Sequence, residues 1–144
     1  MEARKDGFLI TTDKAKLDID LIHDLLRESY WAAGIPLAVV RQSIQHSLCF
    51  GMYDAEVQIG FARVITDYTT FGYLADVFVV DAYRGRGLGK WLIATILGHP
   101  ELQGFRRWML ATRDAHGLYS PFGFAAVKTP ERLMERLDMD IYKR

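Results

Sequence analysis

The period of the hydrophobic pattern changes several times along the chain, and each change marks an element. Residues 8–12 form a short β-like run. Apolar residues then recur at helical spacing in residues 21–30 and again in residues 40–48. Asp18 is placed to cap the first of these helices, and Pro36 suits the first turn of the second. The sequence therefore predicts a strand followed by two amphipathic helices.

From residue 48 onward the apolar positions alternate, which is typical of strands with one buried face. Residues 48–52 and 57–65 flank the turn 54–56 and so predict an antiparallel hairpin. Residues 73–80 are almost continuously apolar, as expected of a central strand that is covered on both faces. Asp76 interrupts this run and is therefore a candidate for a special role.

A turn rich in glycine and arginine follows the central strand and opens a further amphipathic helix at residue 88. The elements predicted after that helix are a strand at 108–112, a short helix at 116–122, weaker strands at 124–127 and 137–142, and helical residues 130–136 between those two strands. No linker, repeat or low-complexity tract interrupts the order. We therefore expect a single domain over residues 1–144, with one mixed α/β sheet.

Composition and charge argue against nucleic acids and membranes as partners of this protein. The 18 Lys and Arg residues balance the 18 Asp and Glu residues, so nucleic acid is not an expected partner. The longest uncharged stretch, residues 29–40, is too short to span a bilayer, and the charged first seven residues do not form a signal peptide. No membrane association is expected, and the sequence predicts a soluble, cytoplasmic protein.

Cysteine and histidine positions bear on metal binding. Cys49 is the only cysteine, which excludes an internal disulfide and a cysteine-rich zinc site. His23, His46 and His99 have no companions at metal-ligand spacing. We therefore expect no metal site.

The most informative segment is the turn that contains Gly85, Gly87 and Gly89. Alternating glycines let the backbone approach a ligand closely, and the N–H groups that open the following helix favour an anion. Three basic residues add positive charge to the same turn: Arg84, Arg86 and Lys90. Phosphate or pyrophosphate is the expected ligand, although glycines of this kind also occur in tight turns that bind nothing.

Two common phosphate loops do not fit this turn. A Walker A loop needs glycine where Arg84 stands, and Ser or Thr where Trp91 stands. A dinucleotide fingerprint needs glycine at the position of Lys90 and an acidic residue about 20 positions further on, where residues 105–110 have none.

Arg84-x-x-Gly87-x-Gly89, between an apolar strand and a helix, resembles the acetyl-CoA pyrophosphate loop of the GNAT superfamily of N-acetyltransferases. Residues 111–124 resemble a second segment of that family, a strand and helix ending in Tyr-x-x-x-Gly-Phe that begins here at Tyr119. The 32 residues from Gly87 to Tyr119 are a spacing typical of the family, and the predicted element order resembles the GNAT fold over nearly the whole chain.

The resemblance implies an α/β GNAT fold with a mixed, mostly antiparallel sheet of six to seven strands and about four flanking helices. It also implies acetyl-CoA as co-substrate, held by strand backbone and by the glycine turn. Thr112 stands where the family often has asparagine, at a position that contacts the pantetheine arm. The cofactor-binding residues implied are Phe78, Val79, Val80, Arg84, Gly85, Arg86, Gly87, Leu88, Gly89, Lys90 and Thr112.

Acetyl transfer from a thioester to an amine needs a deprotonated amine, donors to the oxyanion and a proton for the leaving thiolate. The resemblance implies that Tyr119 protonates the thiolate, and a phenol is a suitable neutral acid at pH 7. The alternative for Tyr119 is a core tyrosine. Asp76 is the candidate base, and its alternatives are pairing with a basic side chain or a water chain that makes a dedicated base unnecessary.

In the family, the loop between the first two helices helps to form the acceptor pocket, which implicates Tyr30 and Trp31. We therefore expect an N-acetyltransferase that moves the acetyl group of acetyl-CoA directly to the amine of a small molecule. Two alternatives remain open: a catalytically silent acyl-CoA-binding or regulatory module, and an acetyltransferase acting on protein N-termini or lysines. The resemblance is compatible with a monomer or a homodimer.

Overall fold

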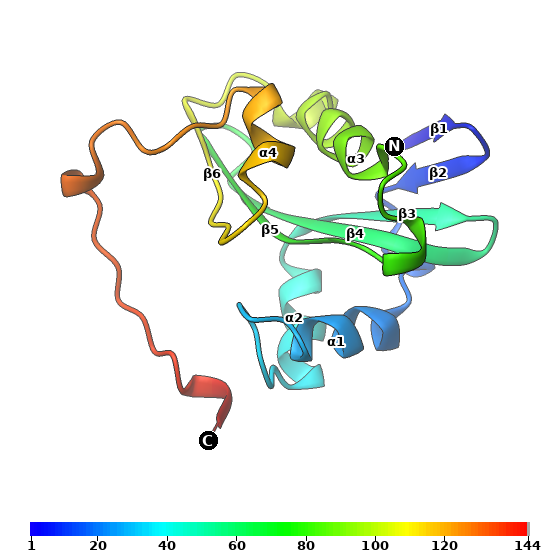
Figure 1. Cartoon of the computed structure of the whole chain (residues 1–144), viewed down its shortest axis with the longest axis horizontal. Helices are drawn as coiled ribbons and strands as arrows, with labels where there is room; N and C mark the ends of the chain where they lie inside the picture. The colour runs from blue at the N-terminus through cyan, green and yellow to red at the C-terminus, as the bar shows by residue number, and fades with distance from the viewer. Residues whose placement is uncertain (144) are drawn as a thin grey trace.

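Six strands of the computed structural model, which describes residues 1–143, form one sheet in chain order (Figure 1). The strands are β1 (Glu2–Lys5), β2 (Phe8–Thr11), β3 (Leu48–Asp54), β4 (Val57–Thr66), β5 (Phe71–Val79) and β6 (Arg107–Met109). Neighbouring strands are antiparallel from β1 to β5, and β6 is parallel to β5. The mixed, mostly antiparallel sheet predicted from the sequence is thus confirmed.

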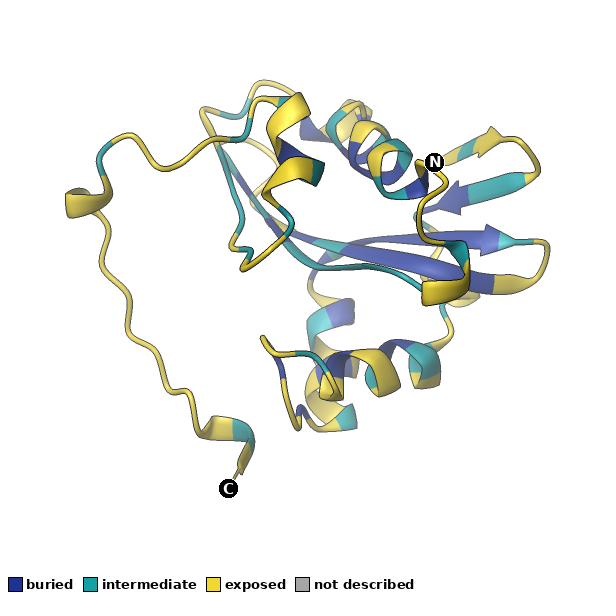
Figure 2. Ribbon diagram, viewed as in Figure 1, coloured by how far each residue is buried: buried dark blue, intermediate teal, exposed yellow. Residues whose placement is uncertain are grey.

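Four α-helices form two layers, one on each face of the sheet (Figure 1). Helices α1 (Ile19–Arg27) and α2 (Leu37–Gln45) cover one face, and α3 (Leu88–Leu97) and α4 (His116–Tyr119) cover the other. The strands lie between the two layers, and β3 and β4 are the most buried of them (Figure 2). Each layer shares a hydrophobic cluster with the sheet, which is the packing that amphipathic helices require.

Local signals explain where several elements begin. The Asp18 side chain accepts a hydrogen bond from the N–H of Leu21 at 3.0 Å and so caps α1, as predicted. Pro36 is the N-cap of α2, one position before the helical turn in which it was expected. The predicted hairpin around residues 54–56 is confirmed by the antiparallel pairing of β3 with β4.

Both ends of the chain differ from the predicted pattern. Strand β1 was not predicted, because its sequence Glu-Ala-Arg-Lys lacks an apolar alternation; the turn at Asp6 and Gly7, both with positive φ, pairs it with β2. The strands predicted at 124–127 and 137–142 are absent from the described sheet. Residues 130–136 were predicted to be helical, but only Pro130–Arg132 are, as a single 3₁₀ turn.

The second half of β5 is less covered than its apolar sequence predicts. Gly72 and Leu74 are buried, but residues 75–79 are only half-buried. The cause is that the neighbouring strand does not follow β5 along its whole length, so an apolar strand becomes the wall of an opening.

Candidate active site

Strands β5 and β6 share only three residue pairs, from Phe71 opposite Arg107 to Tyr73 opposite Met109. Beyond these pairs the strands separate, and among the described residues no strand pairs with the β6 side of residues 74–79. Backbone N–H and C=O groups at such an edge require hydrogen-bond partners. The separation therefore creates an opening in which an extended ligand can bind to the backbone of β5.

A cleft with a volume of about 970 Å³ lies at this opening. Its walls come from the loop between α1 and α2, from β5, from the glycine turn and the start of α3, from the segment after β6, and from α4. The volume is in the range of ligand-binding clefts, and the lining is largely apolar and aromatic with a few charged groups.

The glycine turn forms one end of the cleft. Gly85 and Gly87 have φ of +78° and +77°, in the left-handed region that side chains rarely adopt. Apart from the adjoining residues of the chain, no atom of residues 1–143 lies within 4 Å of the position that a Cβ would take at either residue, so the space beside this backbone is open to a ligand. Gly87 caps α3 without a side-chain hydrogen bond, so the first N–H groups of that helix remain available to an anion.

Basic side chains surround this turn. The Arg84 guanidinium pairs with Asp81 at 2.9 Å, between Nη1 and Oδ1, and its Nε donates to the carbonyl of Val79 at 3.1 Å. Arg86 lies over the ring of Tyr83, with its Cζ 5.1 Å from the ring centroid. This positive charge at a helix N-terminus fits a pyrophosphate group.

Tyr119, at the end of α4, lines the cleft and is only 7% exposed. Its ring packs edge-on against Phe124 with 6.0 Å between centroids. Burial raises the pKa of Tyr119 to about 12, so the hydroxyl stays protonated at neutral pH. The residue can therefore act as a neutral proton donor inside the cleft.

A β-bulge in β5 determines the position of Asp76. Phe61 of β4 pairs with Phe78, and Arg63 pairs with Ala75, so β5 contains one more residue than β4 between these pairs. Asp76 has a φ of +57°, which is uncommon for a residue other than glycine. Such strain persists only where the surroundings hold it.

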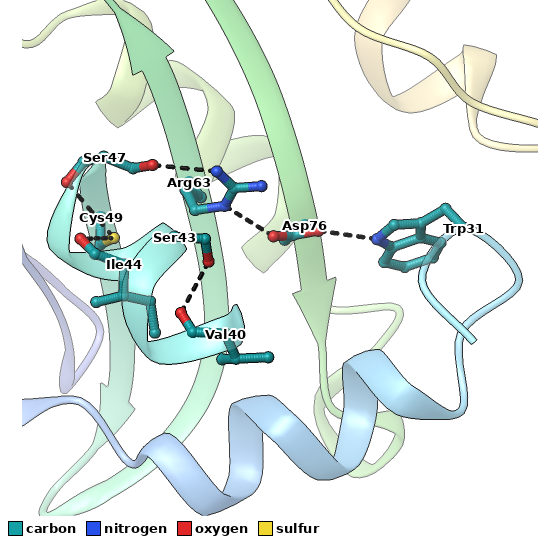
Figure 3. A network of polar contacts seen from close by, with 8 residues as sticks. All are labelled: Trp31, Val40, Ser43, Ile44, Ser47, Cys49, Arg63 and Asp76. Carbon is teal, nitrogen blue, oxygen red and sulfur yellow. Dashed lines mark hydrogen bonds and ion pairs between the residues drawn. The ribbon is translucent and has the colours of Figure 1, made fainter. Parts of the chain in front are cut away.

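The Asp76 carboxylate is held by two donors (Figure 3). Arg63 donates from Nε to Oδ2 at 2.8 Å, and Trp31 donates from its indole Nε1 to Oδ1 at 2.9 Å. Arg63 also donates to the Ser47 hydroxyl at 3.1 Å. The Arg63 and Asp76 side chains are 16% and 9% exposed, so this ion pair is largely shielded from water. It matches the structural alternative that the sequence left open for Asp76.

Tyr30 joins the α1–α2 loop to the segment after β6. Its hydroxyl accepts a hydrogen bond from the N–H of Arg113 at 2.9 Å, and the Arg113 guanidinium lies 4.0 Å from its ring centroid. The rings of Tyr30 and Trp31 meet edge to face at 5.1 Å. Thr112 accepts from the N–H of Ala115 at 3.0 Å, so its hydroxyl helps to begin α4.

The structure brings together most of the residues predicted from the sequence. The lining of the cleft includes Tyr30, Trp31, Asp76, Phe78, Val79, Arg84, Gly85, Gly87, Leu88, Gly89, Lys90, Thr112 and Tyr119. Val80 and Arg86 lie outside that lining. Val80 donates its N–H to the carbonyl of Ile59 at 2.8 Å, which directs this group toward β4.

The lining also includes residues that were not predicted, among them Arg63, Arg113 and Tyr142. Arg63 had a signal, because it is a charged residue on the apolar face of an alternating strand, and such a group requires a partner. Arg113 and Tyr142 had no such signal in the sequence, because their contacts join segments that are far apart along the chain.

Cys49 lies beside the Arg63 network but outside the cleft lining (Figure 3). Its thiol is directed toward the carbonyl oxygens of Ile44 and Ser47, at 3.7 and 3.8 Å. Burial raises the pKa of Cys49 to about 11, which keeps the thiol protonated.

Within residues 1–143, no group of three or more His, Cys, Asp and Glu side chains is placed to hold a metal ion. Over the same residues, no helix combines the length and the apolar character that crossing a membrane requires.

Known proteins are similar to this chain in sequence and in fold. Residues 19–124 match the sequence model of the acetyltransferase (GNAT) family. A Gibberella zeae protein, named as a candidate acetyltransferase, is 33% identical over 138 residues, covering 80% of this chain and 77% of its own. A crystal structure of a candidate GNAT acetyltransferase from Xanthomonas campestris is 48% identical, with a TM-score of 0.94 over 98% of this chain and 100% of that one.

The fold also occurs in a complex with the expected co-substrate. A GNAT acetyltransferase from Elizabethkingia anophelis with acetyl-CoA bound has a TM-score of 0.64 over 84% of this chain and 78% of that one, at 16% identity. The family match covers most of the chain, and the open β5 edge and the glycine turn suit an acetyl-CoA site. The chain belongs to the GNAT family of acetyltransferases.

Proposed function

We propose that this acetyltransferase moves the acetyl group of acetyl-CoA directly to the amine of a small molecule, and that residues 1–144 act as one catalytic domain. The observation that carries the proposal is the separation of β5 from β6 next to the glycine turn. We call the part of the cleft at Gly85 and Gly87 the phosphate end. The part lined by Tyr30 and Trp31 is the acceptor end.

The residues of the phosphate end fit coenzyme A. The open backbone beside Gly85 and Gly87, the start of α3, and the side chains of Arg84 and Lys90 would bind the pyrophosphate. The free edge of Phe78 and Val79 would bind the pantetheine arm through the backbone. When bound, acetyl-CoA supplies an acetyl group activated as a thioester.

Tyr119 and Asp76 have different proposed roles. The Tyr119 hydroxyl holds a proton that it can donate to the sulfur as the carbon–sulfur bond breaks. The amine nitrogen, as it bonds to the carbonyl carbon, would release its excess proton to water, and the Tyr119 phenolate would regain a proton from water. Both oxygens of Asp76 already accept hydrogen bonds, so we assign it to positioning Trp31 at the acceptor end. Cys49 is outside the cleft and protonated, which favours direct transfer over an acyl-cysteine intermediate.

The charges of the acceptor end favour a small acceptor. Asp76 is neutralised by Arg63, and Asp114 faces Arg113 at 3.9 Å. Among residues 1–143, the acceptor end thus offers aromatic surface and carboxylates that are each paired with an arginine, which suits a compact, partly apolar amine better than a lysine-rich protein segment. The cleft must also hold the cofactor within its 970 Å³.

The first experiment measures cofactor binding and turnover in the same protein. Coenzyme A at 100 times its Kd adds about 2.7 kcal/mol to the free energy of unfolding, so the melting temperature rises. Release of free thiol from acetyl-CoA with a panel of small amines then separates an enzyme from a silent binding module. Thermal stabilisation without thiol release for any amine would support the silent module. Labelled acetyl-CoA in cell extract, followed by mass spectrometry, distinguishes acetylated metabolites from acetylated proteins.

The second experiment tests Tyr119. Tyr119→Phe is expected to lower kcat by about 100-fold, the range for a lost general acid, and to leave the affinity for coenzyme A nearly unchanged. Tyr53→Phe is the matched control, because burial also raises the pKa of Tyr53 to about 12 but the residue does not line the cleft. Equal turnover in the two variants would remove Tyr119 from the proposed mechanism.

A further inference from the structure

Arg63, in the lining of the cleft, has more hydrogen-bond donors than partners. A guanidinium group carries five N–H donors and no acceptor. Nε donates to Asp76 at 2.8 Å, and Nη1 donates to the Ser47 hydroxyl at 3.1 Å. Among residues 1–143, no group accepts a hydrogen bond from the third nitrogen, Nη2 (Figure 3). Both N–H groups of Nη2 are therefore free within the part of the chain that the structure describes.

The free donors result from the way in which the Asp76 carboxylate is shared. An arginine and a carboxylate commonly pair through two parallel N–H···O bonds. Asp76 instead accepts from Arg63 at Oδ2 and from the indole N–H of Trp31 at Oδ1, at 2.8 and 2.9 Å. The ion pair thus uses one nitrogen of the guanidinium. Because Trp31 occupies the second carboxylate oxygen, Nη2 of Arg63 is available to a second carboxylate.

This nitrogen belongs to a group that lines the cleft and is largely shielded from bulk water. The Arg63 side chain is 16% exposed. Helix α2 contributes Val39 and Ser43 to the same lining, and the Ser43 hydroxyl donates to the carbonyl of Val40 at 2.8 Å. Shielded donors of a charged group require acceptors. A ligand that brings an oxygen acceptor into this part of the cleft is therefore stabilised by Arg63.

The charges of the acceptor end favour a negatively charged oxygen acceptor. Both oxygens of Asp76 already accept hydrogen bonds. The Arg113 guanidinium lies over the ring of Tyr30, and its 3.9 Å contact with Asp114 is too long for a hydrogen bond. Guanidinium donors are thus in excess, whereas the Asp76 carboxylate is engaged. A carboxylate on the ligand fits this arrangement better than a second ammonium group does.

Exposed apolar side chains in the lining define the rest of the ligand. Tyr30 and Trp31 are each 46% exposed and Val39 is 38% exposed, and all three line the cleft. An apolar part of the ligand that covers them is removed from water together with them. Asp76 and Phe78 are two residues apart on β5, a separation of about 7 Å. A small molecule held beside Asp76 can therefore reach the edge proposed for the pantetheine arm.

We infer that the acceptor is an amino-acid-like compound, an amine that also carries a carboxylate, and that Arg63 binds this carboxylate through Nη2. The inference rests on the proposed acetyl transfer. The apolar part of the acceptor lies against Trp31 and Val39, and its amine faces the β5 edge at Phe78. Arg63 is thus a specificity-determining residue that binds the acceptor and takes no part in the changes of bonding.

Thiol release from acetyl-CoA with paired amines tests the inference. The panel contains α-amino acids and longer ω-amino acids, each compared with its own carboxamide. We expect kcat/KM to be at least about tenfold higher for the acid than for the amide of the best pair, the range for a lost hydrogen bond between charged groups. The longer compounds separate binding of the carboxylate from its effect on the pKa of a neighbouring amine.

Arg63→Lys assigns the preference to this residue. Lysine keeps a positive charge beside Asp76, but its single nitrogen lacks the fork of donors that can serve two carboxylates. The acid-to-amide ratio of kcat/KM is expected to fall to below about threefold. This ratio compares two amines in one preparation, so partial unfolding of the variant does not change it. The control is Arg4→Lys, at an exposed arginine outside the cleft lining that pairs with Glu2, and it is expected to keep the wild-type ratio.

Inhibition of the wild type gives a readout that needs no variant. Pentanoate is expected to compete with the acceptor amine, and pentanamide is not; equal inhibition by the two overturns the inference. Equal kcat/KM for acids and amides, or an unchanged ratio in Arg63→Lys, also overturns it and leaves the proposed acetyl transfer standing. Thermal stabilisation by coenzyme A without thiol release for any amine overturns both, because the chain would then be a silent binding module.

Discussion

The phosphate end and the acceptor end of the cleft both contain backbone in the left-handed region, but the chain stabilises it in different ways. At the phosphate end, Gly85 and Gly87 have no side chain, so the conformation carries little cost. At the acceptor end, Asp76 has a side chain, and its conformation is held by Arg63 and Trp31. The first end depends on local sequence, and the second on contacts between distant segments.

Loss of Arg63 is the largest expected effect, because it removes the support of the acceptor end. Arg63→Met leaves the shielded Asp76 carboxylate without its ion pair and is expected to lower the free energy of unfolding by about 3 kcal/mol. Urea denaturation at pH 7 measures this loss. The control Arg4→Met breaks an exposed pair with Glu2 and is expected to cost less than about 0.5 kcal/mol. Equal losses in the two variants would contradict the supporting role of Arg63.

Substitution of Gly87 by a residue with a side chain tests the phosphate end. Gly87→Val places a β-branched residue at a φ of +77°, which strains the turn and fills the open space beside it. We expect at least about tenfold weaker binding of coenzyme A by calorimetry, equivalent to roughly 1.4 kcal/mol. Gly7→Val is the matched control, because its φ is +85° but the residue lies in the β1–β2 turn. It is expected to lower stability and leave the Kd unchanged.

Substitution of Asp76 distinguishes positioning from base catalysis. Asn tolerates the left-handed region, so Asp76→Asn keeps the backbone and removes the charge. A positioning role predicts an acceptor KM about fivefold higher with kcat and the pH–rate profile nearly unchanged. A base role predicts a fall in kcat of about 100-fold and an altered profile. Asp81→Asn, which breaks the ion pair at the phosphate end, is expected to leave the acceptor KM unchanged.

The smallest expected effect is a pH dependence of stability that arises from His99, which lies outside the phosphate end and the acceptor end of the cleft. His99 caps a 3₁₀ turn by accepting the N–H of Glu101 at 3.0 Å, and burial lowers its pKa from 6.5. The unfolded chain therefore binds a proton more readily than the fold does, so the free energy of unfolding falls as the pH drops below 6.5. We therefore expect the melting temperature to fall as the pH is lowered from 7 to 5. His99→Asn keeps a capping group and is expected to weaken this dependence, and an unchanged dependence would assign it to other groups.

The same contrast explains how much of the site could be predicted from the sequence. Most residues predicted for the phosphate end line the cleft, because Gly85, Gly87 and Lys90 lie within one short segment of the chain. At the acceptor end, Tyr30 and Trp31 were implicated only through the resemblance to the family. The partner of Asp76 was not identified, because the pairing of Arg63 with it depends on a bulge that shifts the register of β4 and β5.

The errors in the predicted fold also have physical causes. Strand β1 is a polar edge strand, and the Asp6-Gly7 dipeptide was its one turn signal. The alternation in residues 137–142 indicated a strand, but the described sheet does not include this segment, because an alternating pattern reports the character of a segment and does not supply a neighbouring strand. The central strand was expected to be covered along its whole length, but residues 75–79 are only half-buried. An apolar sequence does not distinguish a strand covered by helices from one that borders an open cleft.

The burial of Cys49 makes this protein convenient to assay and to label. Burial raises the pKa of Cys49 to about 11, so the thiol stays protonated at pH 8 and is expected to react slowly with thiol reagents in the folded enzyme. The coenzyme A released by turnover is then the dominant reactive thiol in solution. A cysteine introduced at an exposed position, such as that of Met134, is likewise expected to be the main site that takes a spectroscopic probe, with the native Cys49 left in place.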